Sequence, residues 1–501
     1  MEGQIKSFGS GLRTVARSFF AGSLIMITAA IVACGGSGMG MGNSAAGVST
    51  GTSSGTTMVS VGTITGFGSV LMNGLEFQTT SATISIDGQS AMQGDLHAGD
   101  IVQVKGHHDS SKNQDIADEI DFRGNIEGPV TAIDTGAQSL AVLDQTVVVT
   151  ADTSFDDAIN PASLAGISAG DILEISGMTA ADGTVHATRI ERKPAGTGFQ
   201  VIGTAASTDA MAKTLMTNAL VVNFSAATLM DFPSTGPKDG DRVEATGTAV
   251  DSSGALLATR LELRTGEDFK ADAGAPSEIE GLITRFASAT DFDVSGRPVT
   301  TSSSTVFEHG NASDLTLNLR VEAEGTVNAA DVLVATEVRI GHPADTRLIG
   351  QVDSVDAAGA TLIVLGTTIG VDAMTRFDDH GPQKIDTFGL TSLHSGDWVE
   401  VRGSESTTVT GSIAAMRIDR LKPQSGVQLA GAVASAAQPN FTILSTTIAT
   451  TASTQFNQGL NATTFFAAPV GKTATVKGSW NGTVLSATSI QLGDEGGGGD
   501  E

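Results

Sequence analysis

The sequence predicts an all-β protein, a tandem array of about six small β-barrels. Three observations lead to this fold class: a strand motif that recurs six times, a second strand after each copy, and further short apolar runs before each copy. The chain has 501 residues, which is too long for a single hydrophobic core. A division into repeats therefore accounts for both the length and the pattern.

The strand motif is eight residues long and is intact at positions 99–106, where the sequence is GDIVQVKG. Apolar and polar residues alternate in it, and alternate side chains of a strand point to opposite faces. We therefore expect one apolar face and one solvated face. The initial Gly-Asp suits a tight turn, and the closing Gly suits a second turn or a β-bulge. The six copies begin at Gly99, Gly170, Gly240, Asn318, Gly396 and Gly471. The fourth copy lacks Gly-Asp, and the sixth has Lys472 in place of Asp.

A second strand is predicted after each copy because an Ala recurs there in register, with an Ile, Leu or Val three residues later. These marker Ala residues are Ala117, Ala187, Ala258, Ala335, Ala415 and Ala487. Turn residues such as Asn481-Gly482 lie between the two strands. Each copy of the motif is therefore expected to form a β-hairpin.

Each repeat needs additional strands, because a lone hairpin is not stable in water. Every repeat starts at a Gly within a short strand-like stretch, and a second apolar run follows. Four repeats then carry a Thr-x-Phe element, at residues 153–155, 305–307, 375–377 and 454–456. The copies of the motif start 70 to 78 residues apart, and about five strands in that length predict a small closed barrel of the OB type. Closure also removes exposed sheet edges.

These patterns divide the chain. The predicted barrels are residues 58–123, 124–195, 196–275, 276–343, 344–422 and 423–492. Residues 493–501 form an acidic, Gly-rich tail that we expect to be disordered.

The first 33 residues have the character of a secretory signal peptide. Lys6, Arg13 and Arg17 give a basic start, and the apolar stretch 19–33 is short for a membrane span. The sequence IVACG at 31–35 resembles the bacterial lipobox, which implies that Cys34 is acylated and becomes the first residue. The alternative is a simple signal anchor. By the same resemblance, Gly rather than Asp after Cys34 implies the outer membrane.

Cys34 is the only Cys, so the barrels must fold without a disulfide despite an exported location. Residues 34–57 hold this Cys and an uncharged stretch rich in Gly, Ser and Thr. Such a composition predicts a flexible tether with an r.m.s. reach of about 25–30 Å.

The charge balance argues against nucleic acid as a partner. The chain has 28 Lys and Arg against 55 Asp and Glu, a net charge of −27. Phosphate binding depends on basic residues, and single strands also stack on aromatic side chains. The chain has no Tyr and two Trp, so we predict an acidic protein that does not bind nucleic acid.

The most regular polar feature is a Glu in the centre of four motif copies. These residues are Glu174, Glu244, Glu322 and Glu400. They could face a divalent cation, which makes them weak metal candidates. We favour a solvated strand face on which they pair across the hairpin with Arg189, Arg260 and Arg417, at about 0.2–1 kcal/mol per pair. We therefore predict no metal and no cofactor.

Two His-acid clusters, at 107–109 and 377–381, lack the spacing of zinc or calcium sites. The acids of the second cluster are expected to belong to a turn after the Thr-x-Phe element. The chain also lacks the Gly-x-Ser-x-Gly, phosphate-loop and His-Glu-x-x-His motifs. No catalytic residue is predicted, and we expect that the protein is not an enzyme.

The motif strand, the marker strands at 187–191 and 258–262, and the Thr-x-Phe element together resemble domain-of-unknown-function family 5666. The resemblance covers about residues 59–492 and is strongest in the first, second, third and fifth repeats. Modules of this family occur, often in tandem, in exported bacterial lipoproteins. The resemblance implies fold and location but no activity and no catalytic residue.

We therefore expect a non-enzymatic lipoprotein of the bacterial cell envelope that acts as a structural or binding scaffold. The lipid on Cys34 would hold it to the outer membrane, and an envelope protein or a small ligand would be its partner. The alternative is a barrel array that binds a small ligand or divalent cation in grooves between repeats. An unrecognised enzyme is the third hypothesis.

Overall fold

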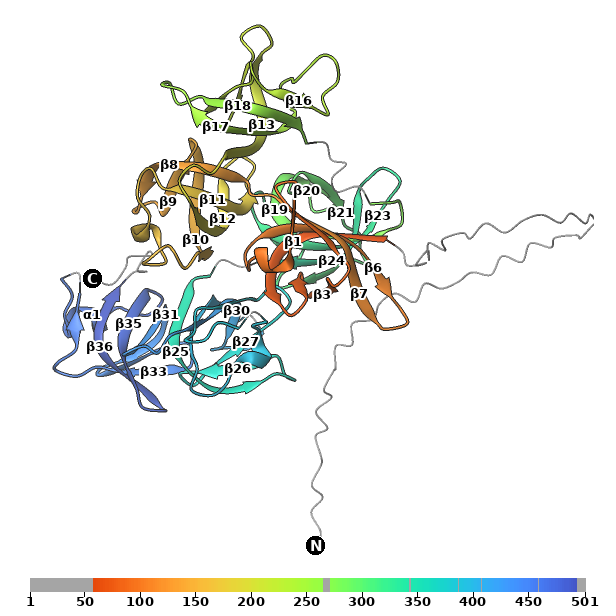
Figure 1. Ribbon diagram of the computed structural model, residues 1–501. Helices are drawn as coiled ribbons and strands as arrows, with labels where there is room; N and C mark the ends of the chain where they lie inside the picture. Colours follow the sequence, from red (N-terminus) through yellow and green to blue (C-terminus); the bar gives the residue numbers. More distant parts are fainter. Residues whose placement is uncertain are drawn as a thin grey trace, which may run out of the picture. The chain divides into compact units, whose positions relative to one another are not determined.

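The computed structural model describes residues 57–264, 271–341, 344–385, 387–406, 408–457 and 459–492. The predicted signal peptide, Cys34, nearly all of the tether and the acidic tail lie outside the described residues. In the described part of the chain, strands β1 to β36 form the structure together with one short α-helix, α1 (Ala462–Ala467) (Figure 1). The predicted all-β class is confirmed.

The strands of each repeat follow one another in the same order. The first repeat contains β1 (Thr57–Phe67), β2 (Val70–Met72), β3 (Leu75–Gln78), β4 (Thr83–Ile86), β5 (Gln89–Ala91), β6 (Ile101–Asp109) and β7 (Gln114–Phe122). The second contains β8 (Ile126–Asp134), β9 (Ser139–Val142), β10 (Gln145–Phe155), β11 (Ile172–Thr179) and β12 (Val185–Lys193). The third contains β13 (Phe199–Asp209), β14 (Thr214–Thr217), β15 (Leu220–Asn223), β16 (Thr228–Met230), β17 (Arg242–Val250) and β18 (Leu256–Leu263).

The last three repeats have the same plan. The fourth contains β19 (Pro276–Ser288), β20 (Asp291–Val294), β21 (Arg297–Thr300), β22 (Val306–Glu308), β23 (Arg320–Val327) and β24 (Leu333–Ile340). The fifth contains β25 (Thr346–Asp356), β26 (Thr361–Val364), β27 (Thr367–Gly370), β28 (Arg376–Asp379), β29 (Trp398–Glu405) and β30 (Ile413–Leu421). The sixth contains β31 (Val427–Ala437), β32 (Asn440–Ile443), β33 (Thr446–Ala449), β34 (Gln455–Phe456), β35 (Thr473–Trp480) and β36 (Val484–Leu492). Short 3-10 helices at Gln93–Asp95, Leu164–Gly166, Ala312–Asp314 and Leu390–Ser392 precede the motif strand in four repeats, and α1 does so in the sixth.

Five strands of each repeat close into a ring. In the fifth repeat β25 pairs with β26 and β29, β26 with β27, β27 with β30, and β30 with β29. The β27–β30 pairing is parallel and the other four are antiparallel. The same ring recurs in the other repeats, for example β1–β2–β3–β7–β6 in the first. Small closed OB-like barrels in tandem are therefore confirmed.

The hairpin of each motif copy contains a β-bulge at its closing Gly. The register shifts at that Gly, and the Gly then lies opposite the marker Ala, as Gly106 lies opposite Ala117. A Cβ on Gly106 would overlap the carbonyl oxygen of Ile116, the residue before the marker Ala. At each of the other five closing Gly residues, a Cβ would overlap the carbonyl oxygen of the residue before the marker Ala of that hairpin. All six marker Ala residues are buried. Small residues at both positions thus let the two strands bend closely over the core.

The Thr-x-Phe element is fastened to the marker Ala. Thr153 Oγ1 donates a hydrogen bond of 2.7 Å to the carbonyl oxygen of Ala187. The same bond joins Thr305 to Ala335, Thr375 to Ala415 and Thr454 to Ala487. The Thr-x-Phe element therefore marks a second parallel pairing with the last strand of the barrel, in addition to the one that closes the ring. The strands that make it are β22, β28, β34 and the end of β10.

The motif turn also has a common structure. The carboxylate of Asp100 accepts a hydrogen bond from the backbone N–H of His97, three residues earlier, at 2.7 Å. Asp171, Asp241 and Asp397 accept the equivalent bond. In the fourth copy, Asn318 replaces the initial Gly and has a φ of 64°, a conformation that Asn tolerates better than most residues. The turn therefore survives the substitution.

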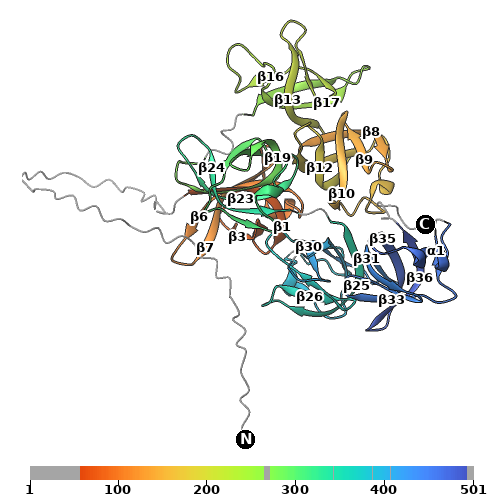
Figure 2. The same ribbon diagram turned by 180° about the vertical axis from the view of Figure 1, so that it is seen from behind.

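The barrels are joined in pairs by shared sheets. β8 of the second barrel pairs antiparallel with β13 of the third, and β25 of the fifth pairs antiparallel with β31 of the sixth. The first barrel pairs with the fourth, through a parallel contact of β1 with β19 (Figures 1 and 2). The three sheets have 13, 11 and 12 strands. The first strand of each barrel thus pairs with strands of its own ring and with the first strand of the paired barrel.

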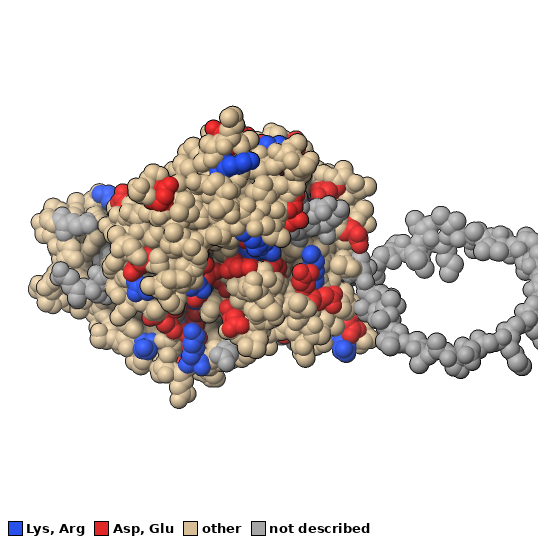
Figure 3. Space-filling model, turned by 45° about the horizontal axis from the view of Figure 1, so that its top comes forward, with Lys and Arg blue, Asp and Glu red and all other residues tan. Residues whose placement is uncertain are grey.

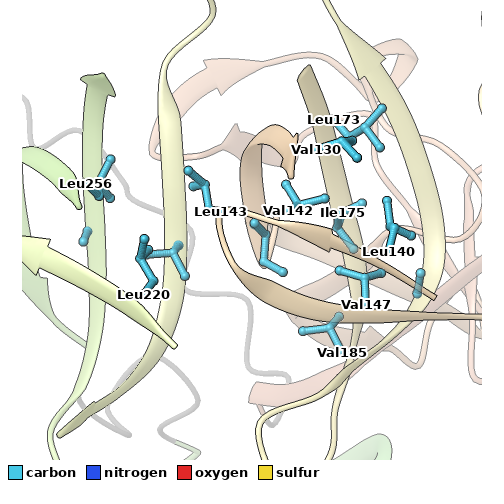
Figure 4. Close-up of a cluster of buried hydrophobic side chains, with 14 of the residues drawn as sticks. Val130, Leu140, Val142, Leu143, Val147, Leu173, Ile175, Val185, Leu220 and Leu256 are labelled. Carbon is cyan, nitrogen blue, oxygen red and sulfur yellow. The ribbon is translucent and has the colours of Figure 1, made fainter. Parts of the chain in front are cut away.

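The cores follow this pairing. One continuous cluster of buried apolar side chains fills the second and third barrels, and another fills the fifth and sixth. Figure 4 shows Leu143 between side chains of the second barrel and Leu220 and Leu256 of the third. The first and fourth barrels have separate cores, although Val59 of β1 packs into the fourth.

Candidate functional site

Charged side chains are concentrated where barrels meet. Figure 3 shows Asp, Glu, Lys and Arg gathered around the middle of one face, with other residues predominating around them. Several charged side chains at the junctions, such as Glu244, Glu280 and Arg376, are buried, which is costly unless each is paired. The junctions therefore contain the candidate functional groups of the protein.

The four Glu residues of the motif strands are buried, so the prediction of a solvated face is wrong at these positions. Glu174, Glu244, Glu322 and Glu400 are between 1% and 8% exposed. The reason is the sharing of sheets. The first strand of the same barrel lies beside the motif strand, and a strand of the paired barrel continues the sheet, as in β11–β8–β13 and β29–β25–β31.

Each of these Glu residues pairs with a base, but none of these bases is Arg189, Arg260 or Arg417, the predicted partners. Glu174 contacts Lys193, and Glu322 lies 2.5 Å from Arg339. Glu244 pairs with Arg123 and Arg264, and Glu400 with Arg347 and Arg402. The predicted partners Arg189, Arg260 and Arg417 instead contact Glu191, Glu262 and Asp419, each two residues further along its own strand. A Lys or Arg side chain thus offsets the charge of each of the four Glu residues.

The surroundings shift the pKa of these carboxyl groups in opposite directions. Burial would raise the pKa of Glu400, but Arg402 and Arg347 lower it to about 2. Burial raises the pKa of Glu174 despite Lys193. Burial and the facing Glu174 raise the pKa of Glu127 to about 7. Acids thus outnumber bases beside β8.

The first–fourth junction contains a second group of buried acids. Glu278 accepts a hydrogen bond from Ser60 Oγ at 3.0 Å, and Glu280 accepts one from the backbone N–H of Thr63 at 2.8 Å. Burial and the neighbouring Glu322 raise the pKa of Glu278 well above its usual range. These bonds attach β19 side chains to β1 of another barrel.

Three barrels meet at a group of charges that we call the hub: Asp152, Arg320, Arg376 and Arg417. Asp152 of the second barrel lies 2.5 Å from Arg320 of the fourth and 3.6 Å from Arg376 of the fifth. Arg376 also donates to the Asp152 carbonyl oxygen, and Arg417 donates to that of Thr153. Burial would raise the pKa of Asp152, but the three Arg residues lower it.

Sequence reasoning missed the hub. Arg376 is the middle residue of a Thr-x-Phe element, where the other repeats have Ser154, Val306 and Gln455. A charge at that position was the available signal. Arg376 is only 2% exposed, and burial lowers its pKa to about 10.

A cluster with metal-binding character lies next to the hub. Asp378, His380 and Asp419 each offer a ligand atom, and these atoms lie within 4.8 Å of one another, the one such group found in the described part of the chain. His380 Nε2 lies 3.3 Å from Asp378 Oδ2, and His380 Nδ1 lies 2.9 Å from Asp157 Oδ1 of the second barrel. Burial would lower the pKa of His380, but Asp378 and Asp419 raise it to about 9.

This cluster was only half visible in the sequence. The acids of this segment are predicted to lie in a turn, yet Asp378 and Asp379 both lie in β28, and only His380 and Gly381 follow the strand. The parallel register of β28 with β30 places Asp378 opposite Asp419, which is 41 residues later. In the other His-acid segment, His107 and His108 contact different acids, Asp118 and Asp115, as two adjacent side chains that point apart should.

A cavity of about 280 Å³ lies between the fourth and fifth barrels. Its lining includes Arg320 of the hub, His309 and Asp372. His309 Nε2 and Asp372 Oδ2 lie 3.6 Å apart in this lining. The cavity is therefore polar at its edge and large enough for a small ligand.

A family model described as "Domain of unknown function (DUF5666)" matches residues 60–121, 127–191, 280–339, 349–419 and 430–491, more than half of the chain. The protein belongs to the DUF5666 family. The matches include the degenerate fourth and sixth repeats and not the third, so the prediction that the third is among the strongest DUF5666 repeats is wrong. Its ring β13–β14–β15–β18–β17 is nevertheless the same.

Comparison with curated proteins gives no match to this DUF5666 chain. Among the residues that the structure describes, no helix has the length and apolar character needed to cross a membrane.

Proposed function

We propose that this DUF5666 protein is a non-enzymatic lipoprotein of the bacterial cell envelope, anchored at the outer membrane through Cys34, and that its barrels form a structural or binding scaffold. The lipobox-like sequence at 31–35 and the single Cys support the anchor. The absence of recognisable catalytic motifs from the sequence supports a non-enzymatic role.

The observation that carries the scaffold role is the use of the hairpin formed by the second and third strands. In OB barrels this surface commonly binds ligands. Here Gln145 Nε2 of β10 donates to the carbonyl oxygen of Thr217 in the third barrel at 3.0 Å. Thr367 of β27 is hydrogen-bonded to Thr446 of the sixth barrel at 2.7 Å. These hairpins hold other barrels, as expected of a scaffold.

The anchor is tested by expressing the full-length chain in a bacterium and labelling it with a fatty-acid probe. Wild-type protein should carry the label and fractionate with the outer membrane. Cys34→Ala should abolish the label and leave the protein soluble or uncleaved, while Ser44→Ala in the tether should change neither. Unchanged labelling of the Cys34→Ala variant would refute the proposal.

The second candidate function is binding of a small ligand or divalent cation between repeats. The cavity of about 280 Å³ between the fourth and fifth barrels favours it. Native mass spectrometry of the purified full-length protein distinguishes the candidates, since a ligand adds a defined mass and a pure scaffold adds none. We propose that nucleic acid is not a partner, and saturable binding of labelled single-stranded DNA at low salt would contradict this.

A further inference from the structure

We propose that Asp378, His380 and Asp419 of the fifth barrel form a zinc site. The ligand atoms of these three residues already lie within 4.8 Å of one another, on neighbouring strands and the turn that follows β28. One imidazole and two carboxylates are ligands that zinc accepts, and three protein ligands leave a fourth position for water. Such a site requires neither the lipid anchor nor a particular cellular location.

A weakly held carboxylate oxygen points to a ligand at this place. Asp378 Oδ2 is buried and makes no well-aligned hydrogen bond, and its contacts are ion pairs with His380 Nε2 at 3.3 Å and with Arg417 at 3.8 Å. A buried carboxylate oxygen without a well-placed hydrogen-bond donor is costly. A divalent cation between Asp378 and His380 would satisfy this oxygen.

The orientation of His380 has a support typical of zinc sites. Its second nitrogen, Nδ1, lies 2.9 Å from the carboxylate of Asp157. Histidines that bind zinc commonly donate this second N–H to a carboxylate, which fixes the ring and raises the basicity of the ligand. Asp157 belongs to the second barrel, so a zinc ion held by His380 would also strengthen the junction between the second and fifth barrels.

Arg417 lies beside the site without filling it. Its Nε contacts Asp419 Oδ1 at 2.6 Å, and it also donates to the carbonyl oxygen of Thr153. Its NH2 group stays 3.8 Å from Asp378 Oδ2, beyond hydrogen-bonding distance. A zinc ion would take the other oxygen of Asp419, while Arg417 keeps its contact with Oδ1. The imidazole must be neutral when zinc binds, so zinc replaces a proton on Nε2.

The test uses full-length protein purified in detergent, stripped with a chelator and titrated with zinc chloride. We expect one zinc ion per chain by elemental analysis, and an increase in the midpoint of thermal unfolding. His380→Gln should abolish stoichiometric binding. His107→Gln is the matched control, since His107 has a similar carboxylate contact with Asp118 at 2.9 Å, and it should bind like wild type.

A second variant covers the case in which His380→Gln fails to fold. Asp157 is 61% exposed on its side chain, so Asp157→Asn should fold normally. It should weaken zinc binding by about 10- to 100-fold while leaving the stoichiometry at one. Absence of zinc binding by the wild type, or equal binding by wild type and both variants, would overturn the proposal.

Discussion

The junction between the second and third barrels and the hub around Asp152 hold barrels together by different means. The first is a continuous apolar core with a shared antiparallel sheet, and the second is a set of buried charges from three barrels. Apolar burial stabilises in proportion to the area removed from water. A buried ion pair gains little overall, because desolvation offsets the attraction, but loss of one partner is severe. The apolar junction should therefore decide stability, and the hub should decide which barrels meet.

The largest effect is expected from a charge placed in the shared core. Val243 is fully buried in β17, so Val243→Asp should cost several kcal/mol. Because the second and third barrels share one core, both should unfold together. Limited proteolysis should then cut residues 126–264 first and leave 346–492 resistant. Cleavage confined to 199–264 would show that the two barrels are independent units.

Removal of the Asp152 charge from the hub should lower the free energy of unfolding nearly as much. Asp152→Asn leaves Arg376 buried with one fewer carboxylate, and breaking such a pair costs about 3–5 kcal/mol. The free energy of unfolding in urea measures this loss. Asp331→Asn is the control, because the Asp331 side chain is 55% exposed at 3.4 Å from Arg297 and its pair should contribute at most about 1 kcal/mol. Equal effects of the two variants would remove the distinction between hub and surface.

The smallest effect concerns the acids beside β8 and depends on pH. The folded-state pKa of Glu127 is about 7, above its ordinary value of 4.5. Ionisation of Glu127 therefore destabilises the fold as pH rises from about 4.5 to 7, and nothing is lost below 4.5. Glu127→Gln should stabilise the protein by about 1–2 kcal/mol at pH 8, after allowance for partial exposure, and by nearly nothing at pH 4. Thermal unfolding at the two pH values measures the difference, and an equal shift at both would exclude Glu127 ionisation as its cause.

The contrast also explains which features the sequence could predict. The strands, the closing Gly residues and the marker Ala residues depend on contacts within one repeat, and the same contacts recur six times. The strand pattern of each repeat therefore supports the same prediction for the other repeats. The expectation that the motif Glu residues pair within their hairpin was reasonable for a lone barrel. It holds in part, since Glu174 pairs with Lys193 and Glu322 with Arg339 of the same hairpin, but neighbouring strands and barrels cover that face, so these pairs are buried.

The candidate site depends on contacts that do not recur. Asp152 is 168 residues from Arg320 and 224 from Arg376, and only the folded chain brings them together. His380 was visible as part of a His-acid segment, but its neighbours Asp419 and Asp157 come from another strand and another barrel. A repeat pattern carries no information about such single contacts.

The parallel contact of β1 with β19 has a consequence for the order of folding. Ser60 and Glu278, which bond across it, are 218 residues apart. The first barrel can close its own ring early, but the outer edge of β1 stays exposed until the fourth barrel emerges. At a synthesis rate of about 5–20 residues per second that interval is about 10–40 s. An unpaired strand edge is prone to wrong pairing during such a wait, so a chaperone that shields nascent edges should raise the yield of this chain.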